Sequence, residues 1–387
     1  MHPELSDHSI LAAPGASPPA VITLFLCGDV MTGRGIDQVL PHPCAPEIYE
    51  SVMRSAAGYV QLAEEVNGPI PRPVDYPYIW GDSLAVLTKL QPDLRIINLE
   101  TSVTTSNDFW PGKGINYRMH PDNIGCLTAA RIDCCTLANN HVLDWGHDGL
   151  VETLDVLQQA AIASAGAGLD QQEAQTPASL IVPGKGRLLV FAGGAGTSGV
   201  PADWAAGLAR PGVNVLPDFN GQTMWRIKTA VSAVREPGDV VLFSIHWGDN
   251  WGYHIPAAER RLAHQLIDEA GVDVVYGHSS HHVKGIEVYR DRLILYGCGD
   301  FLNDYEGISG YEQFRSDLSL MYFPAFDASS GRLMRLDMVP MQIRRFQTVR
   351  AGMSDSEWLA GTLNREGKQF GTRVESAGDG MLSLKWD

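Results

Sequence analysis

The sequence repeats one order of elements: an amphipathic helix, a glycine or proline break, a short apolar strand and then a polar cluster. The fullest copy begins at Pro256, which suits the first turn of a helix, and continues with apolar residues at helical spacing up to Ala270. Gly271 then permits the left-handed conformation that ends such a helix. A strand over 272–276 follows and leads directly into the polar residues 277–282. This alternation predicts an α/β fold with a mostly parallel sheet flanked by helices.

Two further copies of this order place polar residues at strand ends. Asp82 is positioned to cap a helix over 83–90, and the strand 94–99 then delivers Glu100. A helix near 122–130 precedes a strand over 132–138, which Asn139, Asn140 and His141 follow. Because open α/β sheets bind ligands beyond the carboxyl ends of their strands, we expect these side chains to meet in one site.

The chain divides into a tail, one large domain and an appendix. Residues 1–20 are rich in Pro, Ala and Ser and predict a flexible tail. The main domain spans 21–345 and carries a proline-bounded insertion over 41–81 with a helix near 47–66. Beyond it, a helix near 354–369 and strand-like runs over 372–375 and 381–386 predict a small α+β appendix over 346–387.

Composition and charge exclude several function classes. The net charge of −16 repels phosphate backbones and anionic lipid, so we expect no nucleic-acid partner, and it favours a bound cation. Apolar runs are too short to span a membrane, and the first twenty residues lack the basic head and apolar run of a signal peptide. The six cysteines have no CxxC spacing, which favours buried free thiols over disulfides and predicts a cytoplasmic protein.

Five polar clusters follow apolar strands, and each also has a structural interpretation. Asp29, in the Gly-rich segment 28–35, suits a helix cap, Glu100 a solvated strand end, and 139–146 a local turn network. His246 suits a core histidine, and 277–282 a set of capping hydrogen bonds. However, three histidines so close together after a buried strand indicate a metal. Carboxylates, amides and neutral imidazoles are together the donors that a divalent cation in a hydrolase uses, and a carboxylate between two cations bridges them.

The motifs in this order resemble a known family. The segments are LFLCGDVMTGRG at 24–35, INLET at 97–101, LANNHVLDWG at 137–146, HWGDNWGY at 246–253, VYGHSSHHVKGIE at 275–287 and LYGCGDFLND at 295–304. Spread over about residues 22–345, they resemble the CapA family of poly-γ-glutamate capsule biosynthesis proteins, and look closest to its actinobacterial polyglutamine synthesis accessory proteins. The resemblance implies a metallophosphatase-like, four-layer αββα sandwich with a metal site at the sheet edge.

The resemblance also implies roles by motif position. Asp29 would be a ligand of a first metal site and Glu100 the bridging carboxylate. Asn140, His246 and His278 would complete the second site, and His281 would return to the first. His141 would act as general acid with Asp144 orienting it, and Arg34 would hold an anionic substrate group.

Departures from the metallophosphatase pattern, at Met31 and at Glu100 in place of the shorter aspartate, and from the pattern of the relatives, at Asn250 and Asp300, shape these expectations. Met31 stands where metallophosphatases place a histidine, and a thioether is a poor ligand for Mn, Zn or Fe. We therefore expect one firmly bound divalent metal, and a second that is weak or absent. Asn250 replaces a glutamate common in relatives, Asp300 offers an extra oxygen ligand, and His282 has no assigned role.

Two function classes remain open. The first is a metal-dependent hydrolase or transferase that acts on a polyglutamyl-type amide, or on a phosphate ester, during synthesis of a polyglutamate or polyglutamine capsule or cell-wall polymer. The second is a non-catalytic subunit that binds the polymer or its synthase. A phosphoesterase with an unrelated small anionic substrate is a further alternative. The net charge of −16 would penalise a polyanionic glutamate polymer but not a neutral polyglutamine.

Overall fold

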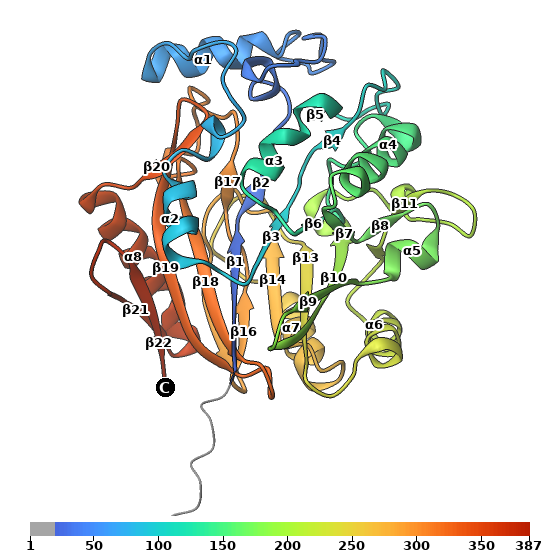
Figure 1. Ribbon diagram of the computed structural model, residues 1–387, viewed down its shortest axis with the longest axis vertical. Coiled ribbons are helices and arrows are strands. Elements are labelled where there is room, and N and C mark those ends of the chain that lie inside the picture. Colours follow the sequence, from blue (N-terminus) through green and yellow to red (C-terminus); the bar gives the residue numbers. More distant parts are fainter. Residues whose placement is uncertain (1–19) are drawn as a thin grey trace, which may run out of the picture.

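Two large β-sheets dominate the protein (Figure 1). The computed structural model describes residues 20–387, so the predicted tail falls almost entirely outside the described residues. The first sheet has nine strands, ordered β21 (Thr372–Ser376), β22 (Leu382–Trp386), β19 (Leu333–Arg344), β18 (Leu318–Asp327), β1 (Val21–Cys27), β3 (Leu94–Asn98), β6 (Cys134–Thr136) and β7 (Ala163–Ala165), with β20 (Gln347–Arg350) beside β19.

The second sheet has seven strands, and its central strands are parallel like those of the first. Strands β1, β3, β6 and β7 run parallel in the first sheet, as do β10, β13, β14 and β16 in the second. The second sheet is ordered β12 (Val215–Leu216), β10 (Gly186–Ala195), β13 (Asp239–His246), β14 (Val274–His278), β16 (Arg292–Leu295) and β15 (Ile286–Tyr289), with β9 (Ala178–Val182) beside β10.

Alternating side chains of the strands build two separate layers of core. In β1, Ile22, Leu24 and Leu26 point into a core shared with the second sheet, whereas Phe25 and Cys27 face the opposite side. Successive residues of a strand point to opposite faces, so a strand covered on both sides needs apolar residues at every position. The continuous apolar run of β1 therefore reflects its place between two cores.

Helices cover the outer face of each sheet. α2, α3 and α4 contribute to the core on the outer face of the first sheet, and α6 and α7 to the core on the outer face of the second. This arrangement confirms the predicted four-layer αββα sandwich. The helices are α1 (Ala57–Asn67), α2 (Ser83–Leu90), α3 (Gly125–Ala129), α4 (Gly146–Gln159), α5 (Gln171–Gln175), α6 (Gly221–Val234), α7 (Ala257–Asp268) and α8 (Met353–Gly367).

Local sequence patterns set most helix positions but not every cap. α2 spans the predicted residues 83–90, yet Asp82 does not cap it, because its carboxylate accepts a hydrogen bond from the backbone of Arg350 instead. α1 begins ten residues later than predicted, because Glu47 and Ser55 pair as a β-bridge in the segment before it. None of the helices over residues 20–387 combines the length and the hydrophobicity needed to cross a membrane.

Residues beyond the predicted boundary at 345 extend the first sheet. β20, β21 and β22 all pair within that sheet, and α8 packs against β19 and β21 of the first sheet and β15 of the second. Leu359 and Leu363 of α8 lie in the core between the sheets. The C-terminal residues thus join the two sheets at one edge of the sandwich.

Candidate metal centre

The two sheets deliver their polar residues to the same edge of the sandwich. Asp29 lies in the short strand β2 (Asp29–Val30), which pairs with β17 (Asp300–Leu302), and the backbone N–H of Glu100 donates to the carbonyl of Val30. Along the chain, Asp29, Glu100 and Asn140 come just after β1, β3 and β6 of the first sheet. His246 and His278 end the neighbouring strands β13 and β14 of the second sheet and stand side by side in register. The carboxyl ends of the central parallel strands therefore meet here, as predicted for ligand sites of α/β sheets.

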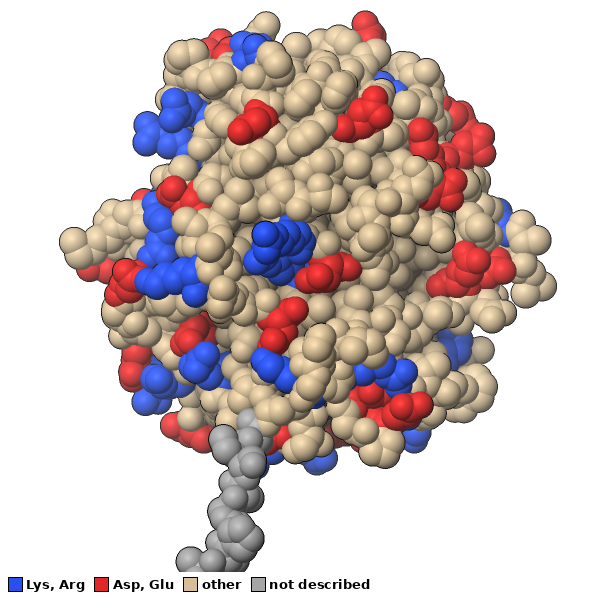
Figure 2. All heavy atoms as spheres, in the orientation of Figure 1, with Lys and Arg blue, Asp and Glu red and all other residues tan. Residues whose placement is uncertain are grey.

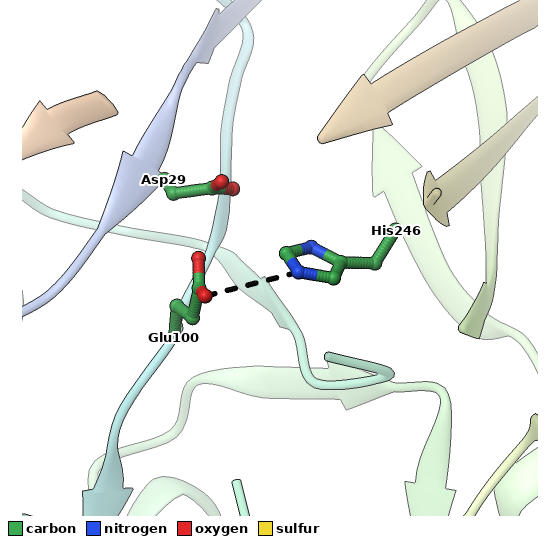
Figure 3. Close-up of side chains that lie close together, drawn as sticks. All are labelled: Asp29, Glu100 and His246. Carbon is green, nitrogen blue, oxygen red and sulfur yellow. Dashed lines mark ion pairs between the residues drawn. The ribbon is translucent and has the colours of Figure 1, made fainter. Parts of the chain in front are cut away.

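Three of these side chains form a compact, fully buried group (Figure 3). One potential ligand atom from each of Asp29, Glu100 and His246 lies within 4.8 Å of the others. Glu100 Oε1 is 3.7 Å from His246 Nε2, and Asn140 Oδ1 is 3.0 Å from the same nitrogen. The sequence-predicted residues Asp29, Glu100, Asn140 and His246 thus converge on one point.

Carboxylates in this group repel one another. Burial raises the pKa of Glu100 well above its ordinary value, and the nearby Asp29 and Asp300 raise it further. Burial also acts to raise the pKa of Asp29, but the adjacent His278 and the amide of Asn98, 2.8 Å from Asp29 Oδ1, outweigh it, so the pKa is lowered. A divalent cation between these carboxylates would replace repulsion with attraction.

The imidazole of His246 is held in the neutral form that binds metals. Burial is the main cause that lowers the pKa of His246 to about 3, so its ring is neutral at physiological pH. His278 Nδ1 is 2.9 Å from Asp29 Oδ1, and the His278 side chain is fully buried. Two buried atoms, His278 Nε2 and Glu100 Oε2, have no hydrogen-bond partner among residues 20–387. Buried polar atoms are normally satisfied, so these orphaned donors and acceptors fit a coordinated divalent ion.

His281 stands apart from this compact group. Its Nδ1 is 3.0 Å from Asp300 Oδ1, and its Nε2 is 3.1 Å from the amide nitrogen of Asn250. Both contacts suit an imidazole that donates from Nδ1 and accepts at Nε2. The predicted first site therefore has Asp29 and Glu100 in place, His281 held by Asp300 and Asn250, and a buried Met31. This first site therefore offers fewer metal ligands than the second, and we call it the thinner donor set.

His141 faces the centre beside a charged pair. Its Nε2 is 3.7 Å from Glu100 Oε1, and its Nδ1 is 2.7 Å from Asp144 Oδ2. Lys113 Nζ lies 2.6 Å from the other Asp144 oxygen and 3.0 Å from His141 Nδ1. Burial is the main cause that lowers the pKa of His141 to about 4, against the opposing pull of Asp144. The predicted His141–Asp144 contact is present, and Lys113 is an unexpected third member.

Arg34 lies in the interior with its own counter-charges. Its guanidinium donates to Glu50 at 2.9 Å and to both oxygens of Asp304, and its side chain is 1% exposed. The rings of Tyr59 and Tyr117 flank it at 3.8 and 4.4 Å. These carboxylates already use the donors that an anionic substrate would need, so the structure gives Arg34 a different environment from the one the resemblance implied.

Sequence reasoning gave no role to two residues that contact the site. Asn98 directly precedes the Leu99-Glu100 strand end, and that position was the available signal. Its amide donates to Asp29, while Thr136 and Asn139 donate to its oxygen. Lys113 lies in a Gly-rich loop without a recognisable motif, so only the folded chain brings it to Asp144.

Comparisons with known proteins agree with these motifs. The sequence model of the family described as bacterial capsule synthesis protein matches residues 23–305. A probable polyglutamine synthesis accessory protein of Mycobacterium tuberculosis is 47% identical over 95% of this chain and 97% of its own length. The PGA biosynthesis protein CapA of Bacillus subtilis is 25% identical over 95% of this chain and 83% of its own. Among solved structures, a phosphatase of Mycoplasma pneumoniae aligns with a TM-score of 0.45 and 12% identity, covering 84% of this chain and 95% of that one.

Proposed function

This chain belongs to the bacterial capsule synthesis protein family, and from that premise we propose that it is an accessory protein of polyglutamate or polyglutamine polymer synthesis with a metal-dependent, hydrolase-type site. The observation that carries the proposal is the buried convergence of Asp29, Glu100 and His246 with orphaned donor and acceptor atoms. Structural packing alone gives no reason to bury such a set unsatisfied.

The residues suggest how the site would work. Asp29, Glu100, Asn140, His246 and His278 would hold one divalent ion, Mn, Zn or Fe. Such an ion supplies Lewis acidity that polarises a carbonyl or phosphoryl oxygen. A second ion would rest on the thinner set that includes His281 and would bind weakly. We place this function in the cytoplasm, which the six free cysteines support.

His141 would move the proton. With Nδ1 turned to Asp144, the atom that faces the centre is Nε2. A neutral imidazole that donates from Nδ1 has its lone pair at Nε2, where it accepts a proton and later returns it to a leaving amine or alcohol. Asp144 holds the ring in this orientation, and Lys113 balances the buried charge of Asp144.

Turnover measurements test the catalytic part of the proposal. We would incubate the metal-loaded protein with glutamine oligomers, with γ-linked glutamate oligomers and with a phosphate monoester. His141→Asn should lower kcat by about 10²- to 10⁴-fold on whichever substrate is cleaved. His264→Asn is the matched control, since His264 lies on α7, outside the centre, and contacts Glu287 and Tyr289 of β15. Unchanged turnover in His141→Asn would refute the role of His141.

A non-catalytic subunit is the second candidate. The structural reason is the thinner first donor set, in which Met31 replaces a ligand and His281 is already held by Asp300 and Asn250. A complex with the polymer synthase that persists in His246→Ala/His278→Ala would support this candidate. Loss of the complex together with the metal would count against it.

A further inference from the structure

A cavity of about 360 Å³ lies beside the metal centre. It is bounded by the end of α1, the segment between β17 and β18, and the end of β19. Tyr305 and Trp251 line it, and the ring of each also packs against His281, with centroids 5.2 Å apart in both cases. Asn303, another lining residue, donates to Asp300, which contacts His281. The cavity therefore shares a wall with His281, the histidine of the predicted first metal site.

That wall carries an aromatic platform. Trp251 and Tyr311 stack with ring centroids 4.0 Å apart and planes within 1°, and Tyr311 is 46% exposed. His282 stacks on Trp251 and Phe314 and so supports the platform. Hydrogen bonds hold its ring in place: Nδ1 donates to the carbonyl of Val283, and Nε2 accepts from the backbone N–H of Gly252. A rigid, partly exposed aromatic pair next to a reactive centre is typical of a surface that binds planar ligand groups.

Charges around the cavity limit what it accepts. The carboxylates of Glu306 and Glu312 line it without an ion pair among residues 20–387, so a polyanion would meet repulsion. Arg315 does not offset them, because Asp317 and Asp355 already hold its guanidinium at 2.8–2.9 Å. Arg344 is the lining cation without an ion pair among the described residues 20–387. The cavity therefore suits an uncharged chain that ends in one carboxylate.

We infer that this cavity binds the carboxylate-terminated end of a neutral polyglutamine chain, in which each residue keeps its side-chain amide. Planar side-chain amides lie on the Trp251–Tyr311 platform, where their N–H groups meet the negative faces of the rings. Arg344 pairs with the terminal carboxylate. The inference rests on the proposed function and narrows it: the amidated polymer, rather than the polyanionic glutamate form, is the ligand.

Calorimetric titration of the intact, metal-loaded protein tests this inference. The probes are hexamers of glutamine and of glutamate with the same α-peptide linkage, each with a free terminal carboxylate. We expect the glutamine hexamer to bind at least about ten-fold more tightly. Equal or tighter binding of the glutamate hexamer, or no binding of either, would overturn the inference.

Two variants locate the binding. Tyr311→Ala should weaken the affinity for the glutamine hexamer by about 3- to 10-fold, and Tyr311→Phe should retain it. Tyr49→Ala is the control, because Tyr49 is a stacked tyrosine of similar exposure, 44%, that does not line the cavity. Arg344→Ala should weaken binding of the free-carboxylate hexamer but not of its C-terminal amide, whereas Arg345→Ala should change neither. Identical effects of Tyr311→Ala and Tyr49→Ala would place the ligand elsewhere.

The same samples separate this inference from the proposed hydrolase. If the glutamine hexamer binds with these variant effects but is never cleaved, the hydrolase proposal fails and the cavity assignment stands. If the hexamer is cleaved with unchanged kcat/KM in both Tyr311→Ala and Arg344→Ala, the cavity assignment alone fails.

Discussion

Buried charged residues in this protein fall into two groups. Arg34 is enclosed with Glu50 and Asp304, so its charge is already balanced. Asp29 and Glu100, by contrast, lie close together at the centre, and the pKa of Glu100 is raised by burial and by its acidic neighbours. A buried charge that has an oppositely charged partner is already balanced, whereas a buried cluster of like charges needs a counter-ion. This contrast assigns Arg34 to the structural scaffold, and Asp29 and Glu100 to the candidate metal site.

Replacing Arg34 tests its assignment to the scaffold. Arg34→Met leaves two buried carboxylates without their counter-charge, so we expect the free energy of unfolding to fall by about 3–5 kcal/mol. Urea denaturation measures this. The control is Arg335→Met, since Arg335 is 59% exposed, pairs with Asp337 and should cost at most about 1 kcal/mol. Unchanged stability of Arg34→Met together with a raised KM would restore Arg34 as a substrate anchor.

Close backbone approach at the strand ends brings the centre together. A Cβ on Gly28, between β1 and β2, would lie 2.0 Å from the carbonyl oxygen of Gly299. The two short strands that carry Asp29 and Asp300 meet at this point, where the backbone N–H of Asp29 donates to the carbonyl of Gly299. Any side chain at position 28 would push β2 away from β17.

Two alanine substitutions test whether position 28 needs a glycine because the backbones approach closely there, or only because glycine is flexible. Gly28→Ala should lower the free energy of unfolding by more than about 2 kcal/mol and weaken metal binding, because backbone must move. Gly361→Ala should instead stabilise by about 0.5–1 kcal/mol, since Gly361 lies within α8 with open space around its Cα. Denaturation curves of both variants measure the free energy of unfolding. Equal changes in the two variants would contradict the close backbone approach at Gly28.

α7 carries a buried carboxyl that makes stability depend on pH. Burial is the main cause that raises the pKa of Glu259 from 4.5 to about 7, with Asp249 raising it and Lys284 lowering it. The folded state thus holds a proton more tightly than the unfolded state, so the contribution of Glu259 is full below pH 4.5 and is lost as pH rises through 7. The stability of Glu259→Gln relative to wild type should therefore increase over this range, with the exposed Glu65→Gln as control. A constant difference would contradict the raised pKa.

Elements built from local patterns were predictable, and those that depend on distant partners were not. The helix 83–90 and the strand before Glu100 follow from apolar spacing, and the motif order gave the residues that converge at the centre. Arg34 could not be placed, because its partner Asp304 is 270 residues away in sequence. The long antiparallel pair β18–β19 was also missed, since the helix–strand alternation that marks the parallel strands is absent there.

Across the whole molecule, charge distribution and architecture agree with a narrow ligand site. On the face shown in Figure 2, acidic and basic side chains are interspersed, without an extended basic patch. With a net charge of −16, the protein would attract a cation and repel a long polyanion. The sandwich meanwhile brings carboxylates and an amide from one sheet to imidazoles from the other. A metal bound at this edge would therefore take its ligands from both sheets.

Metal content is the measurement that tests the central claim most directly. Elemental analysis of the purified protein, after incubation with Mn²⁺ or Zn²⁺ and removal of free ion, should find about one equivalent of divalent metal. His246→Ala/His278→Ala should lose it, whereas His264→Ala, on the outer helix α7, should keep it. If neither wild type nor variant holds metal under these conditions, the cluster is structural and the metal-dependent function is wrong.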